Sequence, residues 1–515
     1  MFRNSAHLFG SRVALLLALT VLVLGTVFMA GAQGGGTLRV GINAPVTLDP
    51  ALGSGDSEVM LNRSIYDYLV EIRPDGTLAP NLATSWDVSD DGLTYTFNLA
   101  EGVTFHDGSP FTAADVVFTF NRLVALESSA IGLLGTDFEA EAVDDSTVVF
   151  TLPAVNADFL FGVGSRFAAI LQDSTDEPNM VGEGDNPYAS FNGTGPFVLS
   201  AFSQGESATL VKNENYWRED QPLVNTLEFV YIDDPVAQID AIRSGAVDVI
   251  FRIPLDEVDQ LDGVEGINVL EQASNLHPVV RIRADEGHLG EDVRIRQAFK
   301  LATDRQGIND LLLDGRGAVG NNDPIGPVFG PFFNDSLEDP GYDPAAACEL
   351  IAETGAERVN TTLYAVDAFN YADLATVLQQ QWAEGCIDVE ILVRPENVYY
   401  GDNEWMDVDL GITGWGPRVI PQAYLTEAYI SEGPFNESHW SNAEIDRLTA
   451  EASATPDIEA RSAIYHQISE IFAEEGPIII PFFMPVIAAA SENVEGLEIH
   501  PFSGRTDFRT VSISG

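Results

Sequence analysis

Apolar residues recur along the chain with two different spacings. Every second residue is apolar in 37–42 and in 409–414, a spacing typical of strands with one buried face. Apolar residues recur every three or four positions in longer segments, which predicts amphipathic helices at 113–122, 292–301, 344–354, 371–384 and 458–474. The two kinds of segment interleave up to the C-terminus without a sequence repeat, so the pattern predicts an α/β chain.

Turn and cap residues indicate where several of these segments begin and end. Trp86–Leu99 divides at an Asp-Asp-Gly turn, which predicts a β-hairpin. Thr112 stands directly before the helix expected at 113–122 and can cap it. A Gly-Pro pair ends the last helix, and the apolar run Ile478–Phe483 behind it predicts a short buried strand.

The first 32 residues have the features of a secretory signal peptide. Arg3 and Arg12 precede the apolar and small residues Val13–Ala32, and small residues stand three and one positions before Gln33. The alternative is an uncleaved anchor, because this run is just long enough to span a bilayer. No cysteine lies near the junction to carry a lipid, and no later segment is apolar enough to span. We therefore expect a periplasmic protein without a lipid anchor.

Length and charge limit the class of protein. Removing 32 of 515 residues leaves 483, which is too many for one core, so two or more lobes are expected. The chain has 79 Asp and Glu against 25 Lys and Arg, a formal net charge of −54. Such a surface repels nucleic acid and anionic lipid, so no nucleic-acid partner is expected. The acidity is consistent with solubility in a salty medium or, alternatively, with a specific basic partner.

The chain contains two cysteines, Cys348 and Cys386. An even number of cysteines in an exported chain favours one disulfide, and two buried free thiols are the alternative. Closing a loop of this length contributes about 4 kcal/mol in the chain-entropy model.

Sequence motifs of catalysis are absent. The chain has no P-loop, HExxH, CxxC or GxSxG motif, and its histidines lack metal-ligand spacing. Gly315–Gly320 matches GxGxxG by letter, but it follows an expected helix instead of a strand, which argues against dinucleotide binding. The sequence therefore predicts no enzyme, no cofactor and no metal site. A secreted hydrolase and a periplasmic chaperone or ligand sensor are the competing classes.

Five motifs, in order along the chain, resemble one known family. They are WDVSDDGLTYTFNLAEGVTFHDGSPFTAADVVFTF at 86–120, GTGPF at 193–197, NYW at 215–217, SGAVD at 244–248 and VRIRQAF at 293–299. The chain thus resembles the extracellular solute-binding proteins of family 5, the oligopeptide-, dipeptide- and nickel-binding components of ABC importers. This resemblance implies a monomer that closes on a small-molecule ligand and delivers it to ABC permease subunits in the inner membrane.

The resemblance also implies a domain organisation. It is the two-lobed periplasmic-binding-protein fold of type II, cluster C, with an extra subdomain inserted in lobe I. On this pattern 1–32 is the signal peptide, and 33–273 is lobe I with the insertion at about 73–191. Residues 274–485 form lobe II, and 486–515 return to lobe I. Two crossing segments near Ala273 and Val486 are expected to act as the hinge.

The segment GITGWGPRVIP at 411–421 is the main candidate for ligand binding. In peptide-binding relatives the similar segment lines the cleft, where its Trp packs on the ligand and an acid three residues later receives the peptide's ammonium group. Trp415 matches the first role, but Arg418 stands at the position of the acid. We therefore expect peptides bound by a free amine to be rejected, and a carboxylate, phosphate or sugar to be preferred. The alternatives are a surface turn and an Arg418 that pairs internally with an acid.

Five further residues are candidates for the same cleft. Asn275 and His277 could add neutral hydrogen bonds, and Tyr424 could close one side. Arg281 and Arg283 follow on the strand that would enter lobe II, where they would share one face. For these two arginines, internal ion pairs are the alternative, because so many acids are available to pair with them.

Overall fold

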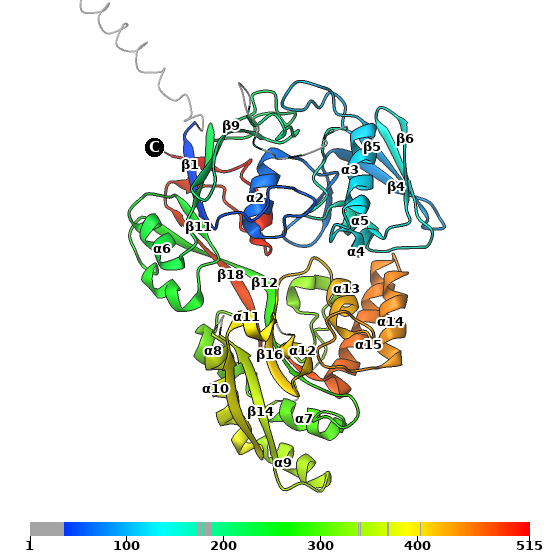
Figure 1. Ribbon diagram of the computed structural model, residues 1–515, viewed down its shortest axis with the longest axis vertical. Helices are drawn as coiled ribbons and strands as arrows, with labels where there is room; N and C mark the ends of the chain where they lie inside the picture. The colour runs from blue at the N-terminus through cyan, green and yellow to red at the C-terminus, as the bar shows by residue number, and fades with distance from the viewer. Residues whose placement is uncertain are drawn as a thin grey trace, which may run out of the picture.

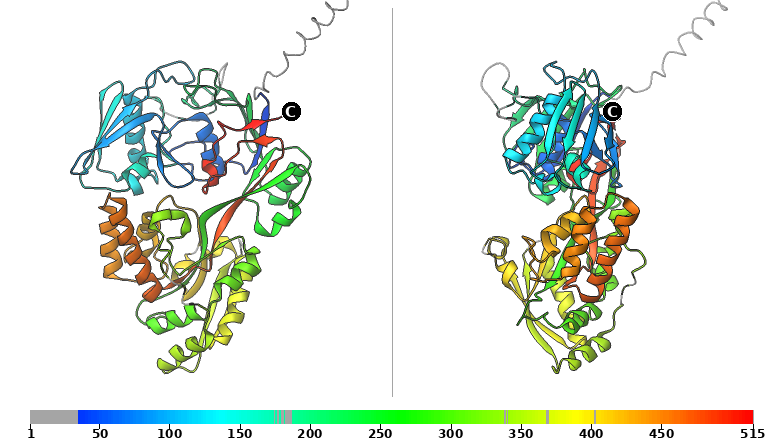
Figure 2. Two further views of the ribbon diagram at one scale, coloured as in Figure 1. Left: turned by 180° about the vertical axis from the view of Figure 1, so that it is seen from behind. Right: turned by 90° about the vertical axis from the view of Figure 1, so that its right-hand side faces the viewer.

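Two long antiparallel strands join two lobes, which lie one above the other in Figure 1. The computed structural model describes residues 35–514, apart from 174, 176–177, 179–180, 182–186, 338, 340, 368–369 and 402. The expected signal peptide lies outside the described residues. The upper lobe holds the blue, cyan and first green segments together with the red C-terminal segment, and the lower lobe holds the yellow and orange segments (Figures 1 and 2).

The connecting strands are β12 (Ile267–Ile282) and β18 (Phe482–Ser491). They pair in regular register from Ile267 opposite Ser491 to Gln272 opposite Val486, and the register then shifts before Leu276. The predicted hinge near Ala273 and Val486 falls on this irregularity. That the lobes rotate there stays a prediction.

A sheet of 12 strands runs through both lobes, in the order β15-β14-β16-β12-β18-β11-β1-β10-β9-β8, with β13 beside β18 and β17 beside β12. Besides β12 and β18, its strands are β1 (Thr37–Ile42), β8 (Phe197–Ser203), β9 (Ser207–Lys212), β10 (Thr226–Tyr231), β11 (Val249–Phe251), β13 (Ala318–Val319), β14 (Val359–Val366), β15 (Ile387–Arg394), β16 (Leu410–Trp415) and β17 (Ile478–Ile479). Strand β1 lies parallel to both β10 and β11, so their carboxyl ends reach the same edge.

The upper lobe contains a second sheet with its own hydrophobic core. Its order is β4-β5-β7-β6, from β4 (Ala83–Val88), β5 (Thr94–Leu99), β6 (Glu139–Asp144) and β7 (Thr147–Thr151). The predicted hairpin is confirmed, because β4 and β5 pair antiparallel. Helix α3 (Ala113–Ala125) begins behind Thr112, which forms a capping box with Asp115, so the predicted cap is confirmed too.

Shorter elements complete the upper lobe. They are α2 (Asp56–Ile65), β2 (Val70–Ile72), β3 (Leu78–Pro80), α4 (Ile131–Leu134), α5 (Phe159–Val163), α6 (Pro235–Arg243), η1 (Leu255–Gln260), β19 (Val494–Glu495), η4 (Ser503–Arg505) and β20 (Ser512–Ile513).

Helices surround the sheet in the lower lobe, and the predicted ones are present. They are α7 (Val293–Leu301), α8 (Arg305–Leu313), η2 (Pro327–Phe332), α9 (Pro344–Glu353), α10 (Tyr371–Glu384), α11 (Glu396–Tyr399), α12 (Glu404–Asp407), α13 (Pro421–Tyr424), the π-helix η3 (Leu425–Tyr429), α14 (Ala443–Ser453) and α15 (Ile458–Glu475). The single strand predicted at Ile478–Phe483 is wrong in its bounds. It is divided between β17 and β18 around Pro481, whose nitrogen carries no hydrogen to donate.

A disulfide joins Cys348 on α9 to Cys386, directly before β15, with an S–S distance of 1.99 Å. It ties a covering helix to the edge strand of the sheet. Within the described part of the chain, no helix is both long and apolar enough to cross a membrane.

Candidate functional site

Both lobes contribute to one cavity of about 760 Å³. The upper lobe supplies the carboxyl ends of β1 and β11 with the residues after them, and the first turn of α2. The lower lobe supplies Leu276 of β12, the end of α8 and the start of α10, and β18 passes along the cavity from one lobe to the other. This volume suits a ligand the size of a short peptide.

The cavity is lined mainly by apolar side chains. These include Ile42, Met60, Ile250, Phe251, Ile253, Leu276, Leu312, Leu313, Leu374, Phe482, Met484 and Val486. Among the described lining residues, the charged side chains are Asp56, Glu58, Asp233 and Arg252. Arg252 forms an ion pair with Asp56 at 3.3 Å. The rim therefore carries more negative than positive charge.

Two of these acids hold the loop that follows β1. Glu58 accepts a hydrogen bond from the backbone N–H of Val46 at 2.7 Å, and Asp233 accepts one from Ala44 at 2.9 Å. The Val46 side chain is 94% exposed. Two hydrogen bonds thus hold the backbone of this loop, while the apolar side chain of Val46 is exposed to solvent.

Trp415 ends β16 and packs inside the lower lobe. Its ring contacts those of Tyr424 and Phe435 edge-on, at 5.8 and 6.3 Å between centroids. Its Nε1–H donates to the buried carboxylate of Glu437 at 3.3 Å. Only 7% of Trp415 is exposed, so its orientation is fixed by protein contacts and the surface-turn alternative does not hold.

Arg418 forms an ion pair with Glu427 of η3, with an Nη2–Oε2 distance of 2.8 Å. Its guanidinium lies 5.4 Å from the Trp415 ring and 5.7 Å from the Tyr424 ring, in cation–π contact with both. The side chain remains 27% exposed. Arg418 therefore pairs internally with an acid, which was one of the alternatives that the sequence left open. Part of its side chain stays accessible to solvent.

Asn275, His277 and Tyr424 surround the Arg418 backbone. The Asn275 amide donates to the carbonyl of Arg418 at 2.7 Å and accepts its N–H at 3.1 Å. The Tyr424 hydroxyl donates to the carbonyls of Asn275 and Gly416 at 2.8 and 2.9 Å. His277 is buried against Tyr424, and burial lowers its pKa to about 4, so its imidazole is neutral at pH 7. These groups hold the 415–424 segment on β12.

Arg281 and Arg283 do not share one exposed face. Arg281 is fully buried, where its guanidinium forms an ion pair with Glu437 at 3.1 Å and donates to the carbonyls of Val408 and Trp405. Arg283 lies just beyond β12 and pairs with Asp285 at 2.8 Å. Both arginines thus form the internal ion pairs that were the alternative to ligand binding. A ligand could reach Arg281 only by displacing its partners.

The alternation of β12 explains why the candidates and the cavity lie apart. Leu276 points into the cavity, so Asn275 and His277 point to the opposite side, toward Trp415 and Tyr424. None of the seven predicted residues belongs to the described cavity lining. Sequence reasoning missed the loop after β1 and the residues after β11. Their signal was available, because ligands bind beyond the carboxyl ends of parallel strands.

A charge from the upper lobe lies near Arg418. Burial lowers the pKa of Arg166, which follows α5, and the positive charge of Arg418 lowers it further, while Asp56 and Glu427 act in the opposite direction. The charges of Arg166 in the upper lobe and Arg418 in the lower lobe therefore influence each other across the lobes.

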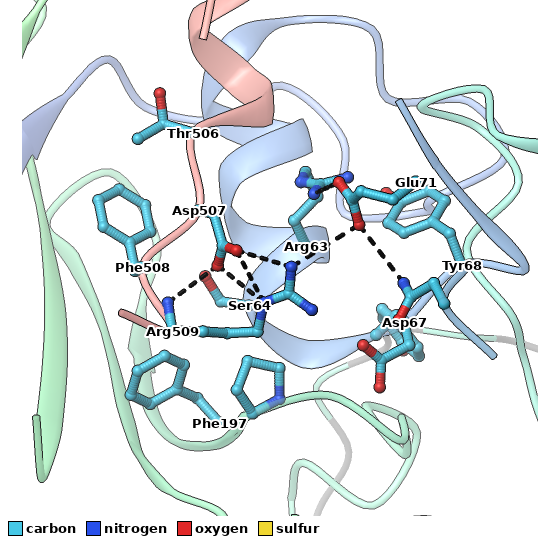
Figure 3. A pocket seen from close by; sticks show the side chains of 13 residues that line it. Arg63, Ser64, Asp67, Tyr68, Glu71, Phe197, Thr506, Asp507, Phe508 and Arg509 are labelled. Atoms are coloured by element: carbon cyan, nitrogen blue, oxygen red, sulfur yellow. Dashed lines mark hydrogen bonds and ion pairs between the residues drawn. The ribbon is translucent and has the colours of Figure 1, made fainter. Parts of the chain in front are cut away.

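A second, small cavity in the upper lobe is structural. Figure 3 shows Arg63, Glu71, Asp507 and Arg509 pointing toward one another around it. Arg63 pairs with Glu71, and Arg509 pairs with Asp507 at 2.6 Å. Its volume is about 10 Å³, which is the space of one water molecule. Among the residues that the structure describes, no group of three His, Cys, Asp or Glu side chains could hold a metal ion.

Two lobes joined by crossing strands, with a ligand-sized cavity between them, define a periplasmic-type binding protein. The family model of bacterial extracellular solute-binding proteins, family 5, matches residues 77–437, and the chain belongs to this family. The chain is the substrate-binding component of an ABC importer, which captures a solute between its lobes and delivers it to a membrane permease. Members of this family are extracytoplasmic binding proteins.

Relatives match over most of their length. Di/tripeptide-binding protein 1 of Pseudomonas aeruginosa (strain UCBPP-PA14) is 29% identical over 504 residues, which cover 91% of this chain and 93% of the relative. Heme-binding protein A of Haemophilus influenzae is 28% identical over 512 residues, covering 92% and 91%. The structure of the ABC transporter substrate-binding protein CtaP from Listeria monocytogenes has a TM-score of 0.80 at 24% identity, covering 93% of this chain and 99% of CtaP, and it shows the shared fold.

Proposed function

We propose that this chain captures a short peptide-like solute with apolar side chains. The observation that carries the proposal is the cavity of about 760 Å³, which both lobes line mainly with apolar residues. Apolar groups of a solute would leave water when the lobes close on them, which contributes about 25 cal/mol per Å² buried. The similarity to a di/tripeptide-binding protein supports the same solute class.

The charges of the rim favour a neutral or cationic solute over an anion. Asp56, Glu58 and Asp233 outnumber Arg252 there. The expectation that peptides with a free amine are rejected assumed an uncompensated positive charge at position 418. Glu427 neutralises that charge at 2.8 Å, so the physical reason for rejection does not apply. We therefore include peptides with a free amine among the proposed solutes.

A thermal-shift comparison of four compounds tests this proposal. The dipeptide Ala-Phe should raise the unfolding midpoint, because a ligand at 100 times its Kd stabilises by about 2.7 kcal/mol. The dipeptide Ala-Asp, maltose and citrate serve as matched controls for the apolar side chain, for sugars and for anions. A shift with citrate or maltose and none with Ala-Phe would contradict the proposed solute class.

We further propose that the segment of Trp415, Arg418 and Tyr424, held on β12 by the buried Asn275 and His277, forms a wall of the cleft next to the cavity, with Arg418 as the group that reaches the solute. Two observations support this role. The Arg418 side chain is 27% exposed, and Arg166 of the opposite lobe lies within electrostatic reach of it. Arg281 and Arg283 would support this wall from behind through their ion pairs.

Replacing Arg418 by Ala should lower the affinity for Ala-Phe at least tenfold, a loss of about 1.4 kcal/mol. Replacement by Asp should lower it further, because it puts a second negative charge near Glu427 where a positive charge stood. Isothermal titration measures the affinity of both variants for Ala-Phe, and Arg447→Ala, at an exposed arginine of α14 away from the wall, is the control. If both Arg418 variants bound Ala-Phe as tightly as the parent, Arg418 would not be part of the binding site.

We also propose that the mature chain begins near Gln33, carries no lipid anchor, acts in the periplasm as a monomer and has no catalytic activity. The sequence of 1–32 and the absence of a cysteine near Gln33 support the first two points. Mass spectrometry of the exported protein checks the new N-terminus.

A further inference from the structure

A contact far from the connecting strands joins the two lobes a second time. Arg461 of α15, in the lower lobe, forms an ion pair through Nη2 with Asp158, the residue before α5 in the upper lobe. The backbone N–H of Ala157 donates to the carbonyl of Ser453, the last residue of α14, at 2.8 Å. In Figures 1 and 2 the cyan helices of the upper lobe accordingly lie against the orange helices α14 and α15.

This contact is enclosed by protein. The side chains of Arg461 and Asp158 are only 4% and 3% exposed. The Arg461 guanidinium also donates to the Tyr465 hydroxyl at 2.8 Å, and it lies 5.7 Å from the ring of Phe332. A carboxylate and a guanidinium in such a dry interface each depend on the other, because removing one leaves an unpaired charge.

The contact requires that the lobes lie together. Asp158 and Arg461 belong to different lobes, which the chain connects through β12 and β18. Any rotation that opens the cleft about those strands separates the two side chains and returns both charges to water. The ion pair therefore forms only in the closed arrangement and is absent from an open one.

Hydrogen bonds connect this pair to α13, next to the proposed wall of the cleft. The Tyr465 hydroxyl, which accepts from Arg461, donates in turn to the side-chain carbonyl of Gln422 at 3.1 Å. Gln422 lies on α13 together with Tyr424, two residues away. The interlobe ion pair is thus hydrogen-bonded through Tyr465 to α13, the helix that carries Tyr424.

We propose that Asp158 and Arg461 form a latch that keeps the lobes together without solute and raises the affinity for every solute by the same factor. Apparent affinity is reduced by the fraction of molecules that are not in the binding-competent arrangement. A latch that increases the closed fraction therefore tightens binding without contacting the solute. This role differs from that of Arg418, whose replacement should affect solutes unequally.

The test uses the full mature chain without solute, so it does not depend on the proposed solute class. Arg461→Gln and Asp158→Asn each remove one charge, and the double variant leaves no charge unpaired. Arg447→Gln is the control, because Arg447 pairs with Glu444 and Glu451 on the exposed side of α14. Circular dichroism identifies the variants that are folded.

Two measurements then decide the proposal. Small-angle scattering should give a larger radius of gyration for the latch variants than for the parent and Arg447→Gln. Hydrogen exchange at the Ala157 amide, which bonds across the interface, should become at least tenfold faster in them. An unchanged radius of gyration and unchanged exchange in the folded double variant would overturn the latch.

Discussion

Replacing Arg281 by Met should lower the free energy of unfolding by about 3–5 kcal/mol, because it leaves the Glu437 carboxylate buried without its counter-charge. Arg281 has no exposed surface, and Glu437 is 4% exposed. Glu437 also holds Trp415 and Thr413, whose side chains donate to its carboxylate. Urea unfolding at pH 7, followed by circular dichroism, measures the effect.

Two variants make this prediction specific. Arg283→Met removes a partly exposed ion pair with Asp285 and should cost less than about 1 kcal/mol. The double variant Arg281→Met/Glu437→Leu should be more stable than Arg281→Met, since no buried charge is then left unpaired. If Arg281→Met and Arg283→Met had equal small effects on stability, the structural role assigned to Arg281 would be wrong.

The sequence predicts helices best where their signals are local. The helix expected at 371–384 has the same bounds in α10, and Thr112 caps α3 as expected. Apolar spacing and capping residues lie within a few positions of one another, so they can be interpreted without knowing the fold. The bounds of β18 were not predictable in this way, because its ten residues are fixed by pairing with β12 far away in sequence.

The site was less predictable, because its geometry depends on pairings distant in sequence. The sequence offers 79 acids, and nothing local indicates that Arg281 pairs with Glu437, 156 residues further on. Arg418 and Glu427 are only nine residues apart, but the structure brings them together through α13 and the π-helix η3. The family resemblance located the 411–421 segment, whereas the cavity lining required the fold itself.

Asp323 is expected to make the protein less stable as the pH rises from about 4 to 8. It is fully buried and accepts one backbone N–H, that of Ile325, at 2.8 Å. Within the described part of the chain, no arginine or lysine forms an ion pair with it. Burial raises its pKa from 3.8 to about 7. The folded protein therefore keeps this carboxyl protonated over a range where the unfolded chain has lost the proton.

The sign of the effect follows from proton counting. Below pH 3.8 both states hold the proton, and Asp323 adds no pH dependence. Between 3.8 and about 7 the folded state holds one proton more, so the free energy of unfolding falls as the pH rises. Above about 7 both states are ionised, and the loss reaches its limit of about 4 kcal/mol, at 1.36 kcal/mol per pKa unit.

Asp323→Asn should remove this dependence, because an amide of the same shape is neutral at every pH in the range and can still accept the Ile325 N–H. The variant should be more stable than the parent at pH 8 by several kcal/mol and differ little from it at pH 4. Urea unfolding of both proteins at pH 4, 6 and 8 measures the difference, with Asp259→Asn as a control at an exposed position. A constant difference between parent and Asp323→Asn across these pH values would show that Asp323 is ionised in the folded protein throughout.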